Sequence, residues 1–171
     1  MIFRSAFYLS YNTNDRSLIV QKAVELGVGK IVPVLTRRCV SRPDERSLAK
    51  KLERWQKIAA SAAEQSGRGR IPQVLALPSF ADAVKRAAGC ELALLPYENE
   101  HALSLRRAVG EAAFETVSIM TGPEGGFSED EVRLAQEAGM QICTLGPRIL
   151  RCETAPLCAL SAVLYAAGAL D

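Results

Sequence analysis

The chain has 171 residues, of which 49% are hydrophobic and 23% are charged, and its formal net charge at pH 7 is +2. This length is typical of a single domain with a sizeable core, and the composition excludes intrinsic disorder as a class. No uninterrupted apolar run is long enough to cross a bilayer, and so small a net charge does not by itself indicate a polyanionic partner.

Short apolar segments alternate along the chain with segments of helical periodicity. In chain order we predict a strand at 7–11, a helix at 15–29, a strand at 30–35, helices at 47–67 and 79–89, a strand at 91–96, a helix at 103–112, a strand at 116–120, a helix at 128–139, a strand at 141–146 and a helix at 154–170. This alternation predicts an α/β fold around a mainly parallel sheet, in one domain that spans residues 1–171.

The cysteines and the N-terminus point to a reducing compartment. The five cysteines are scattered, no CxxC pair occurs, and the only histidine is His101, so we expect no metal site. Free thiols in a chain with its own core are typical of the cytoplasm. Polar residues interrupt the N-terminal segment where a signal peptide needs apolar ones, so we expect no export signal.

A glycine-rich loop, TGPEGG, follows the predicted strand at 116–120. Its glycines can take positive φ angles and let a ligand approach the backbone. Ser128 and Glu131 have the spacing of a capping box, and the carboxylates of this helix start disfavour phosphate. The loop matches neither a Walker A motif nor GxGxxG. By itself it is equally consistent with a ligand site and with a tight strand-to-helix connection.

A second loop, LGPRILRCETAP, repeats this arrangement. Gly146 ends a strand, and Thr154 is expected to cap the last helix. Arg148, Arg151 and Glu153 lie between them. A further strand, in LALLPYE, ends nearby in polar residues. Because ligands of α/β sheets bind beyond the carboxyl ends of strands, these three strand ends can form one pocket.

The motifs TGPEGGFSEDEV and LGPRILRCETAPLCALSA strongly resemble those of the SPOUT-class 16S rRNA uridine N3-methyltransferases, the ribosomal RNA small subunit methyltransferase E type. The segments VQKAVELGVGKIVPVLTRRC and KLERWQKIAASAAEQSGR match in order and spacing, so the resemblance covers nearly the whole chain. It implies a C-terminal deep trefoil knot, S-adenosyl-L-methionine as the cofactor, and a homodimer acting on 16S rRNA in the small ribosomal subunit. It implies a cytoplasmic enzyme, with no membrane and no metal.

Two departures from the family pattern stand out. The family carries an N-terminal PUA-like RNA-binding domain before its first catalytic strand, and this chain begins at about that strand, so we expect the catalytic domain only. Cys152 stands where the family often has Thr. A cysteine there could keep the shape of the loop while losing a hydroxyl hydrogen bond.

Two residues are the catalytic candidates. Uridine N3 carries a proton, so the enzyme must help to remove it or stabilise the charge left on the ring oxygens. We expect Arg151 to hold the uracil or its developing anion. Glu124 is expected to orient the substrate or the ligand, or to assist proton removal. It is equally consistent with a loop carboxylate that bonds nearby backbone N–H groups.

The resemblance assigns the remaining candidates to the cofactor and to RNA. Those expected at the cofactor are Leu95, Thr121, Gly122, Pro123, Gly125, Gly126, Leu145, Gly146, Ile149 and Leu150. Those expected at RNA are Arg38, Arg68 and Arg148, of which Arg148 is equally consistent with a structural role. Trp55 has the helical spacing of a core residue.

Some alternatives remain open at this stage. The alanines of the last helix, at 155, 159, 162 and 166, are consistent with packing inside one subunit and with a dimer contact. Two rival functions are a non-catalytic RNA-binding SPOUT protein and a SPOUT methyltransferase with another RNA target.

Overall fold

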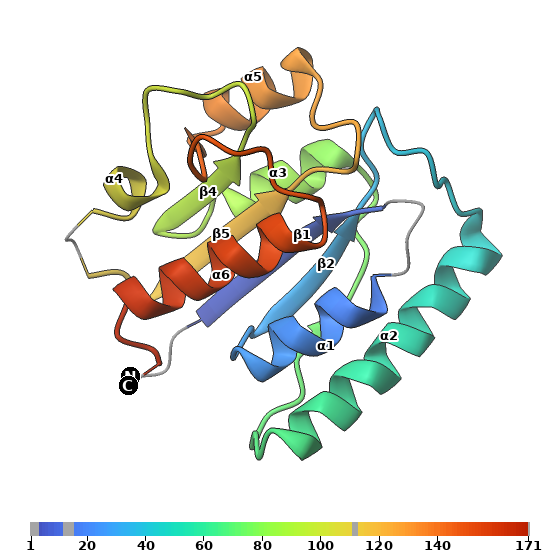
Figure 1. Cartoon of the computed structure of the whole chain (residues 1–171). Helices are drawn as coiled ribbons and strands as arrows, with labels where there is room; N and C mark the ends of the chain where they lie inside the picture. The colour runs from blue at the N-terminus through green and yellow to red at the C-terminus, as the bar shows by residue number, and fades with distance from the viewer. Residues whose placement is uncertain (1–3, 12–15, 111–112, 171) are drawn as a thin grey trace.

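A six-stranded sheet with helices on both faces forms the protein (Figure 1). The computed structural model describes residues 4–11, 16–110 and 113–170. The strands are β1 (Arg4–Ser10), β2 (Lys30–Val34), β3 (Gln73–Val74), β4 (Leu92–Pro96), β5 (Thr116–Thr121) and β6 (Gln141–Cys143). The helices are α1 (Ser17–Glu25), α2 (Glu45–Gln65), α3 (Phe80–Ala87), α4 (Leu105–Val109), α5 (Glu129–Glu137) and α6 (Thr154–Ala166).

Every pair of neighbouring strands runs parallel, in the order β3-β2-β1-β5-β4-β6. The predicted α/β fold with a mainly parallel sheet is therefore confirmed, and the described sheet is parallel throughout. Each crossover between parallel strands needs a long connection, which the helices provide. None of the described helices is long and apolar enough to cross a membrane.

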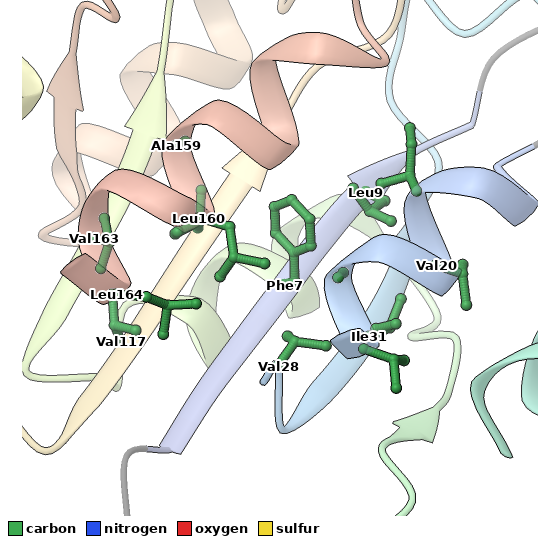
Figure 2. Packing of buried hydrophobic residues seen from close by; sticks show 14 of the residues in the cluster. Phe7, Leu9, Val20, Val28, Ile31, Val117, Ala159, Leu160, Val163 and Leu164 are labelled. Carbon is green, nitrogen blue, oxygen red and sulfur yellow. The ribbon is translucent and has the colours of Figure 1, made fainter. Parts of the chain in front are cut away.

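Alternate residues of each strand serve two separate apolar layers, as the period of a strand requires. Phe7 and Leu9 face α1, α2 and α6, whereas Tyr8 faces α3 and the glycine loop that precedes α5. Figure 2 shows Phe7 on β1 between Leu160 of α6 and Val20 of α1, and all three side chains are at most 1% exposed. The sheet is thus buried on both faces, which explains its apolar strands.

Local sequence signals located some of the predicted features correctly. The capping box of α5 forms between Ser128 and Glu131 as predicted. Trp55 is buried, with its ring centroid 6.1 Å from that of Tyr11, which confirms its core role. Residue Asp15 and residues 111–112, which belong to two predicted helices, lie outside the described residues.

The predicted cap of the last helix is wrong. Thr154 is the first residue of α6, and Glu153 occupies the cap position without a side-chain cap bond. The N–H groups of Thr154 and Ala155 both donate to the Arg151 carbonyl at 2.9 Å, so the chain is already turning before Thr154. A capping side chain needs an extended backbone at its own residue, which this turn removes.

Hydrogen bonds from the Arg68 side chain connect the loop after α2 to the end of α1. Its Nη1 donates to the carbonyls of Val24 and Val28 at 2.9 Å each, and its Nη2 donates to the carbonyl of Gly27 at 3.3 Å. The Val24 carbonyl also accepts the N–H of Gly27 at 3.0 Å, and a cation is favourable at this end of a helix. Arg68 therefore has a structural role.

Replacing Arg68 with alanine should lower the free energy of unfolding by about 1–3 kcal/mol, because it removes charged hydrogen bonds to three carbonyls. Urea denaturation followed by circular dichroism measures this change. Arg70→Ala is the matched control, since Arg70 is exposed in the same GRGR segment and its loss should change stability by less than about 0.5 kcal/mol. Equal midpoints for the two variants would contradict the structural role of Arg68.

Candidate functional site

Three loops meet at the carboxyl edge of the sheet: residues 97–104 after β4, 122–128 after β5 and 144–153 after β6. The first and third are joined by backbone bonds, from Thr144 N to Leu103 O at 2.8 Å and from Leu105 N to Thr144 O at 2.9 Å. The first and second meet where the Glu98 carboxylate lies against Gly126. The structure therefore brings the three predicted strand ends together.

The glycine turn after β5 is packed against its neighbours at this edge, with Gly126 buried and Gly125 exposed. The N–H of Gly126 donates to the Pro123 carbonyl at 3.0 Å, and Gly126 has a φ of +66°. A β-carbon there would contact the Glu98 carboxylate, and one at Gly122 would lie 3.3 Å from the Phe127 ring. Phe127 is 1% exposed and anchors the turn on the core. A side chain at Gly122 or Gly126 would crowd a neighbouring residue, so glycine allows the turn to pack closely.

The basic loop after β2 packs against this turn. Glu131, which is 8% exposed, accepts the N–H of Arg37 at 2.7 Å while its other oxygen accepts from Ser128 N at 2.9 Å. Arg38 Nη1 donates to the Gly125 carbonyl at 3.0 Å. The structure therefore brings Arg38 to the site, with part of its guanidinium engaged by the glycine turn.

The residues predicted to contact the cofactor differ in their exposure to solvent. Leu95 and Thr121 are buried, and Leu95 is fully enclosed in the core, so its backbone is the part that can reach a ligand. Leu145 and Leu150 are half-buried, and Ile149 is 86% exposed. All of the predicted cofactor residues lie in the three loops or at the ends of the strands before them.

The charged candidates lie on the outside of the same edge, with one exception. Glu124, Arg148 and Arg151 are exposed in the second and third loops. Arg68 lies elsewhere, because the carbonyls that it contacts come just before β2 and so belong to the amino edge of the parallel sheet. The structure thus separates Arg68 from the other predicted site residues.

The sequence did not reveal Arg16, a buried arginine beneath the third loop. It is 3% exposed, its Nε donates to the Ser10 carbonyl at 3.0 Å, and its Nη1 donates to the Cys152 carbonyl at 2.7 Å. Burial lowers the pKa of Arg16, and the nearby Cys152, Glu124, Cys39 and Glu153 oppose that change. The one signal in the sequence was an arginine at a helix start, where a capping residue is usual.

Two thiols, those of Cys143 and Cys152, lie near the site. The Cys152 thiol lies 3.1 Å from Glu153 Oε2, so it keeps a hydrogen bond at the position where the resembled family has a hydroxyl. Burial raises the pKa of Cys143 to about 12, which keeps that thiol protonated. The described residues contain no group of three or more His, Cys, Asp or Glu side chains that could hold a metal ion. The carboxylates in the first turn of α5 are suited to a neutral or cationic ligand.

Comparison with known proteins gives consistent matches. A family model described as an RNA methyltransferase domain matches residues 7–164. The Ribosomal RNA small subunit methyltransferase E of Bacillus subtilis is 41% identical over 153 residues, which cover 86% of this chain and 59% of that protein. The protein of the same name from Synechocystis is 39% identical over 85% of this chain and 47% of its own length. The chain therefore spans about half the length of these curated relatives.

Two solved structures share the whole architecture. Ribosomal RNA small subunit methyltransferase E from Neisseria gonorrhoeae, bound to S-adenosyl methionine, has a TM-score of 0.82 and 39% identity, over 95% of this chain and 66% of that one. A methyltransferase of Legionella pneumophila in complex with the cofactor SAM has a TM-score of 0.87 and 34% identity, over 96% and 67%. With the family model matching residues 7–164, this chain belongs to the RNA methyltransferase domain family.

Proposed function

We propose that this chain is the catalytic domain of an S-adenosyl-L-methionine-dependent methyltransferase that methylates N3 of a uridine in 16S rRNA. The observation that carries the proposal is the meeting of three strand-end loops at one edge of the sheet, with Arg151 and Glu124 on two of them. The relatives named for small-subunit RNA methylation support the substrate. The enzyme would act on the small ribosomal subunit in the cytoplasm.

The residues present fit the cofactor. Gly122, Gly125 and Gly126 let the turn pack closely against Phe127, Arg38 and Glu98, and the exposed Gly125 leaves its backbone accessible to a ligand. The start of α5 carries Glu129, Asp130 and Glu131, which disfavour a phosphate and favour a cation. S-adenosyl-L-methionine supplies a methyl group on a positively charged sulfur. The glycine turn and the backbone of residues 145–150 would hold it.

Two charged residues would then act on the uracil. Arg151 donates hydrogen bonds to a ring oxygen, which stabilises the negative charge that develops when N3 loses its proton. Glu124 accepts that proton directly or through a water, or orients the ring. Positioning supplies much of the remaining acceleration, because the reacting atoms are held in line.

The knot is part of this proposal. β6 lies at the edge of the sheet beyond β4, whereas α6 packs near its middle against β5 and α1. Residues 144–153 must cross from one place to the other, and their crossing passes beside the loop after β4, where Thr144 pairs with Ser104. We propose that this crossing threads the chain through a deep trefoil knot.

We further propose a homodimer and an RNA-contacting edge. The outer face of α6 exposes small residues at Cys158 and Ala162, together with Tyr165, which is 76% exposed. An exposed tyrosine beside small residues is suited to a close contact between two copies. Arg38 and Arg148 lie beside the site loops, where they can reach RNA phosphates.

The chain should bind S-adenosyl-L-methionine and S-adenosylhomocysteine, and neither NAD nor ATP. Gly126→Ala should weaken this binding at least about tenfold, or about 1.4 kcal/mol, because the added carbon displaces Glu98. Gly139→Ala is the matched control, since Gly139 also has a positive φ but its β-carbon would have open space. Titration calorimetry measures both. No heat from the unmodified chain near millimolar ligand would contradict the pocket.

Arg151→Ala should reduce methyl transfer by about 10²- to 10³-fold, because it removes a donor to the developing charge. Its affinity for S-adenosylhomocysteine should stay close to that of the unmodified chain. Incorporation of labelled methyl groups into small subunits, followed by mass mapping of the modified nucleotide, measures the effect. Methylation of another nucleotide would refute the proposed target, and an unchanged rate would refute the role of Arg151.

Light scattering should return twice the 18.5 kDa mass of the chain. Ala162→Arg should shift the mass to that of one chain, because a charge replaces a small residue on the outer face of α6. Ile71→Arg is the control, since Ile71 is 59% exposed and lies before β3, outside the proposed contact. A single-chain mass for the unmodified protein at every concentration would rule out the dimer.

A further inference from the structure

Arg16 joins two parts of the fold that are far apart in the sequence. Its guanidinium contacts the end of β1 and the loop before α6, where Cys152 lies 136 residues after Arg16. The guanidinium Nε donates to the Ser10 carbonyl at 3.0 Å, and its Nη1 donates to the Cys152 carbonyl at 2.7 Å. Two carbonyls held by one planar group are fixed relative to each other in distance and in direction.

The N-cap of α1 is an energetically unfavourable position for an arginine. Arg16 stands at the N-cap of α1, where its side chain makes no cap bond and a positive charge opposes the helix dipole. It is 3% exposed, and its Nη2 is buried without an acceptor among the described residues. A small capping residue would serve the helix better. Costs of this kind gather at functional sites, where the surrounding structure maintains them.

The hydrogen bond from Arg16 fixes the third loop at the Cys152 carbonyl. Cys152 directly follows Arg151, and the Arg151 carbonyl accepts the N–H groups of Thr154 and Ala155 at 2.9 Å to start α6. The backbone on the C-terminal side of Arg151 is therefore held from both directions, by α6 and by Arg16. The exposed Arg151 side chain therefore extends from backbone that is held in place.

We propose that Arg16 is a positioning residue of the site, which aims Arg151 by holding the Cys152 carbonyl against the end of β1. The acidic side chains of Glu124 and Glu153 lie within electrostatic reach of its buried charge. Arg16 thereby links the third loop and β1 through one group. This role rests on the proposed function of Arg151 in methyl transfer.

The test compares Arg16→Met, Arg16→Lys and Arg86→Met. Methionine keeps the length without charge or donors, and lysine keeps the charge but cannot hold two carbonyls in a fixed plane. Arg86 is exposed in the last turn of α3 and serves as the matched control. Hydrogen exchange of the peptide covering 145–153, relative to that covering α5, reports the loop without needing activity.

We expect exchange in residues 145–153 to speed up about tenfold in Arg16→Met, with α5 unchanged. The turnover number for methyl transfer should fall about 10- to 100-fold, since misplacement of a reacting group has effects of this size. The dissociation constant for S-adenosylhomocysteine should change less than about threefold. Arg16→Lys should lie between Arg16→Met and the unmodified chain in both loop exchange and turnover.

Unchanged exchange in residues 145–153 in both Arg16 variants would overturn the inference, whatever the activity. The inference would also be overturned if the turnover number of Arg16→Met fell no further than that of Arg86→Met. If Arg16→Met fails to fold, Arg16→Lys is the variant that tests the proposal. Full turnover and normal exchange of residues 145–153 in Arg16→Lys would then refute the proposal. An inactive unmodified chain with the expected exchange result would instead count against the proposed function, so the two failures are distinguishable.

Discussion

The parallel direction of every described strand is the constraint on which the arrangement of this protein depends. Parallel strands place all their carboxyl ends at one edge, so loops that follow β4, β5 and β6 meet although they are separated by about two dozen residues each. The helices that return the chain cover both faces and bury the sheet. The edge is then the place where backbone remains accessible to a ligand.

Two buried charges hold the loops at this edge. The Glu131 carboxylate bonds Ser128 in its own helix start and Arg37 in a loop that is distant in sequence. Arg16 does the same with a positive charge, between Ser10 and Cys152. Charge-assisted hydrogen bonds of this kind are stronger than neutral ones, so they give loops without regular structure a defined shape.

Short-range signals explain which predictions succeeded. The capping box of α5 and the buried position of Trp55 depend on residues within one or two helical turns, and both were predicted. The cap at Thr154 failed because the turn at Arg151 had already begun α6. The separation of Arg68 from the site was equally invisible, because its partners lie about forty residues earlier.

The sequence by itself determined the α/β class, the order of the elements other than β3 and the two glycine-proline loops, because periodicity and turn residues are local properties of the chain. It also carried the family resemblance through these motifs. Only the tertiary structure decided that Arg38 holds the glycine turn, that Arg68 belongs to the opposite edge, and that Arg16 supports the third loop. These roles depend on hydrogen bonds between residues brought together by strand order, which no local pattern encodes.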